Sequence, residues 1–577
     1  MDEELHARAR QLGVETAYSD ADGVMRQADE PTLRFLVDLL ARALQTPDTQ
    51  IPRSGERAVA YQPPFAERGE KAWVLGVQLY SLATQANGGH GNFADLMRLI
   101  DLVAAAGGAG IGLNPLHALD EDGEASPYAP VSRLFLNPLY IDLARLAGPA
   151  HGIADGAPPA DKALIDYQAV ARARNAALRG VYQRLAATPE APDWRDFLAF
   201  RAQGGATLQR YAVFCHQRQR LGRNWRDWPA PWRRPDPTLV ARHAEQHPEE
   251  VGWREMAQFL AHRQLQQCQN HARARGMAIG LYLDLAVGVQ PEGFDAWNEP
   301  EAYLEGATIG APPDPLNRTG QNWGLTAFNP MALRRQAFAP FAAMLAATMR
   351  YAGAIRIDHV LGLNRLYLIP PGNAPAAGAY LNMPVDELLA ALARESQRHR
   401  CLVIGEDLGT VPDGLRAQLR HHGVWTYRVV MFEHGATGFT AADGYPAKAL
   451  VTFSTHDLPT FAGWIEGTDI VLAQRLGLRP PESLRARQAK RRALNSALGL
   501  KPRQRPALGD IARFLASTPC QLVSLSLEDL MGSSTQVNLP GTFREYPNWQ
   551  HRLHLDADQL QTALHDIAKM FPAPGEA

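Results

Sequence analysis

Short apolar runs recur along the chain from residue 72 onward, and polar or amphipathic segments separate them. There are eight such runs: WVLGVQLYSL, GIGLNPL, MAIGLYLDL, GAIRID, CLVIGED, WTYRVVMF, ALVTFST and CQLVSLSL. Apolar residues at adjacent positions are typical of strands buried on both faces, and helical patterns such as DLMRLIDLVAAA and VDELLAALARES lie between most of them. Eight parallel strands with crossover helices predict a closed (β/α)8 TIM barrel, although an open parallel sheet would show similar local patterns.

The first 70 residues have a different pattern. Asp29-Glu30-Pro31 is typical of a helix start, and an apolar stripe follows it at Leu33, Leu36, Val37, Leu40 and Leu44. Residues 46–70 carry four prolines among polar side chains, which is the composition of a linker. We therefore expect a short N-terminal helical extension and linker over residues 1–70, and the barrel over residues 71–577.

Two connections are too long to be single crossovers. The first, roughly residues 117–275, is rich in arginine, tryptophan and helical periodicity. The second, roughly residues 290–331, contains GAPPDP and GQNWGL. We expect large inserted helical subdomains after the second and third strands. Because loops after barrel strands build active sites, the second connection is also a candidate active-site loop.

Composition and charge narrow the classes of partner. Hydrophobic residues make up 46% of the chain, and 58 basic against 60 acidic side chains leave a formal net charge of −2. No overall field favours nucleic acid or an anionic membrane. The four cysteines lie far apart, without the spacing of a metal site or a disulfide framework. The N-terminus starts acidic and lacks a signal-peptide core, so we expect a cytoplasmic protein.

Neither a membrane span nor a cofactor is predicted. The most apolar long stretch, residues 336–355, contains Pro340 and Arg350 and falls short of a spanning helix. Nucleotide chemistry has no support, because the sequence has no glycine-rich strand-to-helix fingerprint and no Walker-type lysine.

Three carboxylates stand at the ends of predicted strands, or just beyond them. Asp358 is the last residue of GAIRID, Glu406 is the second-last residue of CLVIGED, and Asp457 follows ALVTFST. Taken singly, an acid in such a place is more often a helix cap or an ion-pair partner. Together, acids that end strands four, five and seven of one barrel converge on the same rim, which predicts a catalytic set.

This set suits cleavage of a glycosidic bond with retention, which needs a carboxylate nucleophile and a second carboxyl about 5 Å away as acid and then base. Arg356 lies two residues before Asp358, hence on the same strand face, where its charge would hold Asp358 ionised. Glu406 needs a raised pKa to act as the acid. Asp457, beside His456, would then bind the hydroxyls of the distorted sugar.

The segments RIDHVLGL, GEDLGTVP and STHDLPT, in this order and spacing, resemble the motif set of the amylomaltases, the 4-α-glucanotransferases of the α-amylase clan. The resemblance extends over nearly the whole chain from residue 72, through QLYSL, GLNPLHAL, SPYAPVSRLFLNPLYID, DLAVGV, GAPPDPLNRTGQNWG and SLEDLMGSSTQVNLPGT. It implies transfer of α-1,4-glucan segments, with maltooligosaccharides and starch or glycogen chains as substrates.

The resemblance also implies roles for single residues. Asp358 would be the nucleophile, Glu406 the acid/base and Asp457 the transition-state stabiliser. The donor side would be lined by Asp284, Arg356, His359 and His456. An acceptor-side loop would present Asp314, Gln321 and Trp323, and a neighbouring loop Ser126 and Tyr128. The loop GGHGNFADL departs from the family pattern, because His90 and Asn92 replace an apolar residue and an acid.

Aromatic platforms would complete the site, because the faces of glucose are apolar and pack on rings. Trp323 and Tyr80 fit that role by position, although a tryptophan is also often a core residue.

Three other functions share part of this pattern. A hydrolase of the same clan would use the same carboxylates and differ only in sending the glycosyl group to water. A metal-dependent barrel enzyme is conceivable because His359 and His456 stand beside carboxylates. A non-catalytic glucan-binding protein on a degenerate barrel fits less well, because the carboxylate set is intact.

Overall fold

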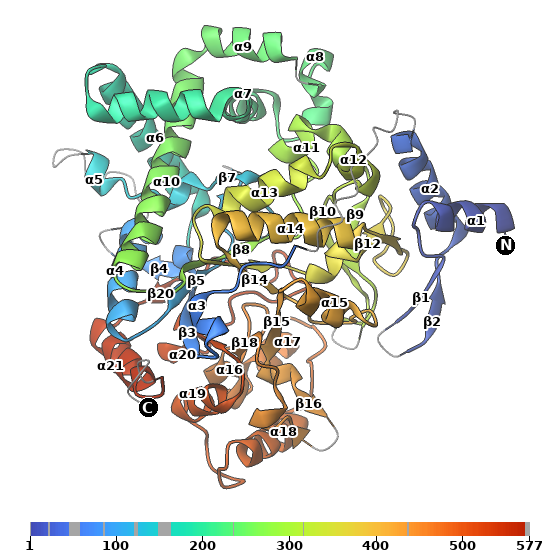
Figure 1. Cartoon of the computed structure of the whole chain (residues 1–577), viewed down its shortest axis with the longest axis vertical. Helices are drawn as coiled ribbons and strands as arrows, with labels where there is room; N and C mark the ends of the chain where they lie inside the picture. The colour runs from blue at the N-terminus through green and yellow to red at the C-terminus, as the bar shows by residue number, and fades with distance from the viewer. Residues whose placement is uncertain are drawn as a thin grey trace.

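Eight parallel strands close a barrel in the computed structural model (Figure 1), which describes residues 2–20, 23–44, 58–84, 87–120, 125–147, 163–234, 236–314, 317–435 and 438–571. Each predicted run supplies one strand: β3 (Ala72–Val77), β5 (Gly110–Leu113), β8 (Gly280–Leu285), β11 (Ala354–Ile357), β14 (Leu402–Gly405), β15 (Trp425–Val429), β18 (Ala449–Thr452) and β19 (Leu522–Ser526). The last strand pairs with the first, so the closed barrel is confirmed over the open sheet.

Side chains alternate between the inside and the outside of the barrel. On β8, Tyr282 and Asp284 lie in one row, and Leu281 and Leu283 pack with the surrounding helices in the other. The inner row is crowded: a Cβ at Gly112 would come within 2.9 Å of a ring carbon of Tyr282. The inside of the barrel beneath the site is therefore tightly filled.

Helices surround the barrel in the order that the alternating pattern predicts. They are α4 (Phe93–Ala105), α10 (Pro248–Ala274), α13 (Ala339–Met349), α14 (Val385–His399), α15 (Leu415–His421), α16 (Phe461–Glu466), α17 (Thr468–Arg475), α18 (Leu484–Ala497), α19 (Leu508–Ser517), α20 (Leu527–Leu530) and α21 (Ala557–Ala568). Between β15 and β18 the chain forms a small hairpin, β16 (His434–Gly435) and β17 (Gly438–Phe439). No helix of the described ranges combines the length and apolar character needed to cross a membrane.

The connection between β5 and β8 is largely helical. It begins with the hairpin β6 (His117–Ala118) and β7 (Ser132–Leu136) and continues through α5 (Ala144–Ala147), α6 (Tyr167–Ala186), α7 (Pro192–Leu221), α8 (Ala230–Arg233) and α9 (Pro237–Gln246) into α10. Figure 1 shows these helices as a separate layer on one side of the barrel. The layer shares an aromatic core with the first helix after β8: Trp228 of the layer and Trp297 of α11 (Phe294–Asn298) are buried against Phe214.

The connection after β8 differs from the helical subdomain expected there. It contains α11 (Phe294–Asn298), β9 (Thr308–Ala311), β10 (Gln321–Leu325) and α12 (Pro330–Arg335). The strands join β12 (Arg365–Ile369) and β13 (Ala379–Asn382), from beyond β11, in a sheet of order β10-β9-β12-β13. Because two separate connections build this sheet, the local pattern of either one could not reveal it.

The N-terminal unit is partly helical. It contains α1 (Glu3–Gln11) and α2 (Glu30–Leu44), and the Asp29 side chain caps α2 at 2.7 Å from the Thr32 nitrogen. Between the helices lies an unexpected hairpin, β1 (Ala17–Ser19) and β2 (Met25–Gln27), whose three-residue strands are too short for a periodic signal.

Only part of the predicted linker lies within the described residues, because 45–57 lie outside them. Residues 58–70 include α3 (Pro64–Glu67) and pack under the barrel. Gln62 there accepts a hydrogen bond from the Trp425 indole at 2.8 Å, and Phe65 meets the same ring edge-on. This stretch therefore belongs to the barrel floor. A second short pairing, β4 (Leu82–Ala83) with β20 (Leu553–His554), ties the C-terminal segment to the first barrel strand.

Candidate active site

Three carboxylates meet at the carboxyl end of the barrel. Asp358 directly follows β11, Glu406 directly follows β14, and Asp457 lies shortly beyond β18. All three line one cleft of about 2140 Å³. Pockets for small molecules usually measure roughly 300–1,000 Å³, so this cleft has room for a chain of several sugar units.

Arg356 is the centre of the charge network under the cleft. The β8–β11 register places it opposite Asp284. Its Nη1 lies 2.9 and 2.8 Å from the two Asp284 oxygens and 2.9 Å from Asp358 Oδ1. The arginine and Asp284 are buried, whereas the side chain of Asp358 keeps 20% of its surface exposed. One guanidinium nitrogen thus ties two carboxylates together and leaves Asp358 open to a ligand.

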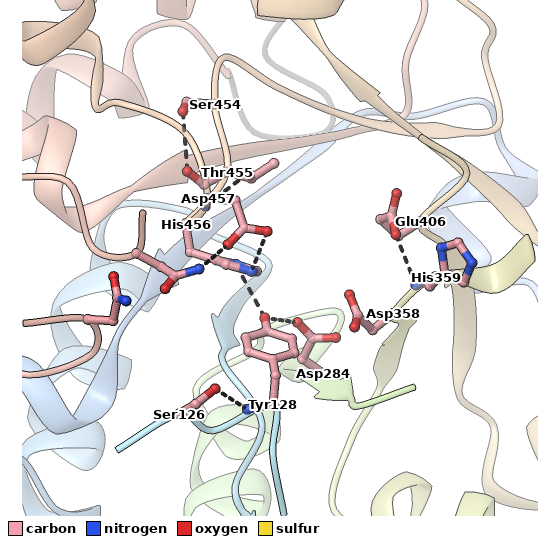
Figure 2. A network of polar contacts seen from close by, with 12 residues as sticks. Ser126, Tyr128, Asp284, Asp358, His359, Glu406, Ser454, Thr455, His456 and Asp457 are labelled. Atoms are coloured by element: carbon pink, nitrogen blue, oxygen red, sulfur yellow. Dashed lines mark hydrogen bonds and ion pairs between the residues drawn. The ribbon is translucent and has the colours of Figure 1, made fainter. Parts of the chain in front are cut away.

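Asp358 and Glu406 stand side by side on paired strands. Ile357 pairs with Gly405, and the Glu406 amide donates to the Ile357 carbonyl at 3.0 Å, so the ladder continues to the two acids. Neighbouring strands lie about 4.8 Å apart. In Figure 2 the Asp358 carboxyl lies in the space between Asp284 and Glu406.

Burial changes how this pair binds protons. It raises the pKa of Asp358 to about 7, against the opposing effect of Arg356 and with a further rise from Asp284 and Glu406. Burial also raises the pKa of Glu406 above its usual value. The sequence predicts that Arg356 keeps Asp358 fully ionised at neutral pH. The contact is present, but burial outweighs it, and the two carboxyls lose their protons as an interacting pair.

Glu406 is held by backbone amides. Its Oε2 accepts from the His359 nitrogen at 2.9 Å and its Oε1 from the Leu408 nitrogen at 2.8 Å. His359 adopts φ 49° and ψ 59°, a left-handed conformation that costs energy for a residue with a Cβ. That conformation aims its amide at Glu406. The His359 ring meets Trp323 edge-on at 5.1 Å, and burial lowers its pKa to about 4, so the ring is neutral.

Asp457 is fixed by residues that sequence reasoning missed. Its Oδ1 accepts a hydrogen bond from Asn538 Nδ2 at 2.7 Å, and the Asn538 amide donates to the His456 carbonyl at 3.1 Å. Gln536 Nε2 donates to the Asp457 carbonyl at 3.1 Å. The Asp457 side chain remains 46% exposed toward the cleft. QVNLPGT already resembles the family, but only the fold brings Asn538 to the acid.

Tyr128 joins Asp284 to His456. Its hydroxyl donates to Asp284 Oδ2 at 2.6 Å and lies 3.2 Å from His456 Nδ1 (Figure 2). Because the phenol has one proton, which goes to the carboxylate, Nδ1 of His456 donates to the phenol oxygen. Burial raises the pKa of Tyr128 well above its usual value, so the phenol stays neutral. Trp549, for which no role is predicted from the sequence, packs against both rings. Its ring centre lies 5.4 Å from that of Tyr128 and 5.2 Å from that of His456.

The remaining predicted residues separate into two groups. Ser126, Asp314, Gln321 and Trp323 line the cleft. The Trp323 indole donates to Gln321 Oε1 at 3.2 Å, and Asp314 Oδ1 accepts from the Asn317 amide at 2.5 Å. Tyr80 does not fit the predicted platform: it is 2% exposed and packs beneath Trp549 and Tyr167.

The unusual loop after β3 has structural contacts. Asn92 caps α4 in a reciprocal capping box with Asp95. His90 is buried between the rings of Tyr140 and Tyr167, where burial lowers its pKa well below the usual value. Neither side chain is among the residues that line the cleft.

A family model and several relatives match most of this chain. The family model described as 4-alpha-glucanotransferase matches residues 77–557. The 4-alpha-glucanotransferase of Haemophilus influenzae is 35% identical, over 86% of this chain and 77% of the relative. That of Mycobacterium tuberculosis is 36% identical, over 84% of this chain and 71% of the relative.

Solved structures share the fold. Amylomaltase from Corynebacterium glutamicum superposes with a TM-score of 0.83 at 25% identity, covering 99% of both chains. Amylomaltase from Streptococcus agalactiae in complex with acarbose gives a TM-score of 0.73 at 18% identity, covering 87% of this chain and 99% of that one, which supports the fold alone. The closed barrel, the matching family model and relatives above one-third identity lead to one conclusion: this chain belongs to the 4-alpha-glucanotransferase family of enzymes.

Proposed function

We propose that this enzyme moves an α-1,4-glucan segment from a donor maltodextrin to the 4-hydroxyl of an acceptor glucan or glucose, by double displacement with retention. The observation that carries the proposal is the pairing of Asp358 and Glu406 on neighbouring strands, since strands about 4.8 Å apart suit the roughly 5 Å carboxyl separation of retaining enzymes. Maltooligosaccharides are the proposed substrates, together with the ends of starch or glycogen chains.

In the first step an Asp358 carboxylate oxygen attacks the anomeric carbon of the donor sugar. The bond from that carbon to the leaving 4-oxygen breaks, and protonated Glu406 gives its proton to the leaving oxygen. Arg356 supports this step because its contact with Asp358 favours the ionised carboxylate. Burial raises the pKa of Glu406 above its usual value, which favours the protonated form that this step requires.

In the second step the 4-hydroxyl of an acceptor chain takes the place of the leaving group. The Glu406 carboxylate accepts its proton as the oxygen attacks the anomeric carbon, and the ester bond to Asp358 breaks. The enzyme returns to its starting protonation state. Two inversions at one carbon give net retention.

Asp457 assists both steps without forming a bond. With Asn538 on one oxygen and His456 3.5 Å from the other, the exposed carboxylate can bind hydroxyls of the donor sugar and strengthen its hold as the ring flattens. Tyr128 and His456, stacked at 4.6 Å, offer a flat surface beside it.

Transfer in place of hydrolysis requires that an acceptor sugar displaces water from the glycosyl-enzyme. The family assignment supports transfer, and the residues from β10 and its loop, which crowd the cleft beside His359, would exclude water once sugar is bound.

Maltotriose provides the test. A transferase converts it to glucose plus chains longer than the input, without net gain of reducing ends. Production of glucose and maltose only, with new reducing ends, would overturn the proposal. Asp358→Asn, which keeps the shape of the side chain, should lose both product classes while it still binds the glucan.

A further inference from the structure

The N-terminal unit is joined edge-on to the small sheet β10-β9-β12-β13. Val14 forms an antiparallel bridge with Leu381 of β13. The Glu15 amide donates to the Tyr380 carbonyl at 2.8 Å, and the Asn382 amide donates to the Gly13 carbonyl at 2.8 Å. Figure 1 shows the unit, in blue, beside the strands of this sheet. The segment after α1 therefore acts as an added edge strand, so the unit and the sheet form one body.

Side-chain contacts also hold the N-terminal unit against this sheet. Glu15 pairs with Arg365 at 2.9 Å, and both are largely buried. The Arg365 guanidinium lies over the Tyr380 ring, 4.0 Å from its centre. Tyr18 of β1 meets the rings of Tyr380 and Tyr367 edge-on at 5.3 and 5.8 Å. Contacts of this kind between aromatic rings contribute beyond the burial of area, so the position of β1 is well defined.

The unit also reaches the cleft. Ser19 at the end of β1, together with Asp20, lines the same cleft as Asp358, and so do Arg365 and Tyr380. Ser19 is exposed. Asp20 holds the hairpin turn, because its carboxylate accepts from the Val24 amide at 2.9 Å and from Arg26 Nε at 2.8 Å. Residues of the N-terminal unit and of β12 and β13, namely Ser19, Asp20, Arg365 and Tyr380, thus form one wall of the cleft.

The wall is continuous with the active-site loop. Strand β10, which carries Gln321 and Trp323, belongs to the same sheet as β13, and Asp314 and Tyr380 line the same cleft. A glucan that runs past Trp323 and Asp314 would therefore meet Tyr380, Arg365 and Ser19. Arg365 covers one face of the Tyr380 ring, so the ring offers its remaining exposed surface to a sugar. The Arg365 guanidinium and the Ser19 hydroxyl offer groups that hydrogen-bond sugar hydroxyls.

We propose that the N-terminal unit and Tyr380 form an outer binding site for long α-1,4-glucans, which takes sugar units beyond those that react. The proposal rests on the proposed function and adds a source of chain-length preference to it. Its occupant is the distal part of a linear glucan.

Substitution at Ser19 tests the proposal. Ser19→Trp places a bulky ring on the wall, and Asp38→Trp places the same ring on an exposed position of α2 that does not line the cleft. The measured quantity is the ratio of kcat/KM for a long linear amylose to kcat/KM for maltotriose. Loss of one such contact changes a rate about three- to tenfold, so Ser19→Trp should lower the ratio by that factor. Asp38→Trp should leave it unchanged.

Failure of the outer site and failure of the proposed transfer give different results in this experiment. An unchanged ratio in Ser19→Trp, or an equal loss for both substrates, would overturn the outer site. An equal change of the ratio in Asp38→Trp would also overturn it, because the effect would then come from the unit in general. If the unaltered enzyme only hydrolyses maltotriose, the proposed transfer fails, and a fall in the ratio for hydrolysis would still support the outer site.

Discussion

Replacing Arg356 with glutamine should move the whole pH profile of kcat/KM to higher pH. The guanidinium contacts Asp358 at 2.9 Å and lowers the pKa of both Asp358 and Glu406 against the effect of burial. With Arg356 present the pKa of Asp358 is about 7. A neighbouring opposite charge lowers a carboxyl pKa by about 1–3 units, so removing it should raise the pKa of the acidic limb, and we expect a rise of about one to two units.

The magnitude at neutral pH follows from the fraction of Asp358 that is ionised. A carboxyl with a pKa near 7 is about half ionised at pH 7, and a rise of one or two units leaves about one tenth or one hundredth. From ionisation alone, kcat/KM at pH 7 should fall about fivefold to fiftyfold. Part of the loss should return as pH rises, until Glu406 also loses its proton.

Arg356→Lys is the matched control, because one ammonium group can keep the charge beside both carboxylates. It should lose activity through altered geometry while its acidic limb stays near that of the unaltered enzyme. The assay is the initial rate of glucose release from maltotriose at low concentration across pH 5 to 10, since kcat/KM reports the free enzyme. A glutamine variant with an unmoved acidic limb would refute the electrostatic role of Arg356.

The same substitution should make the free energy of unfolding depend more strongly on pH than it does in the unaltered enzyme. In Arg356→Gln the folded-state pKa of Asp358 lies further above the unfolded value of about 3.9. The folded state then binds more protons than the unfolded state between these two values, so stability falls as pH rises through that window. Melting temperatures at pH 5 and pH 8 should therefore diverge more in the variant than in Arg356→Lys.

Two further substitutions probe the contacts around the acids. Asn538→Ala removes the 2.7 Å hydrogen bond to Asp457; a hydrogen bond to a charged group contributes about 1.5–3 kcal/mol, so kcat should fall roughly 10- to 150-fold with little change in KM. A rise in KM at constant kcat would assign Asn538 to ground-state binding. Tyr128→Phe keeps the ring but removes the hydroxyl from Asp284 and His456, and steady-state kinetics should show kcat/KM lowered by about tenfold or more. Unchanged kinetics would limit Tyr128 to a stacking role.

The barrel could be predicted from the sequence because its strands are buried on both faces and so leave continuous apolar runs. The three acids could be placed on one rim for the same reason, since each ends a run or closely follows one. The sheet β10-β9-β12-β13 could not be predicted, because its strands pair across separate connections of the chain.

Side-chain contacts that form only in the folded protein could not be predicted from the sequence either. Asn538 lies far along the chain from Asp457, and only the fold brings the two side chains together. Tyr80 looked like an exposed platform because it follows a barrel strand, yet Trp549 and Tyr167 cover it. The effect of burial on the pKa of Asp358 likewise has no sequence signature, because it depends on the depth of the site.

In the proposed mechanism Asp358 carries the glucan as a covalent ester, and trapping that ester is the most direct test. Glu406→Gln removes the base of the second step, whereas α-maltosyl fluoride needs no acid to enter the first. Mass spectrometry of the digested variant should find one maltosyl group on the peptide that contains Asp358, and the adduct should disappear when Asp358 is also changed to Asn. An adduct on another residue, or turnover of the fluoride without any adduct in Glu406→Gln, would contradict the account.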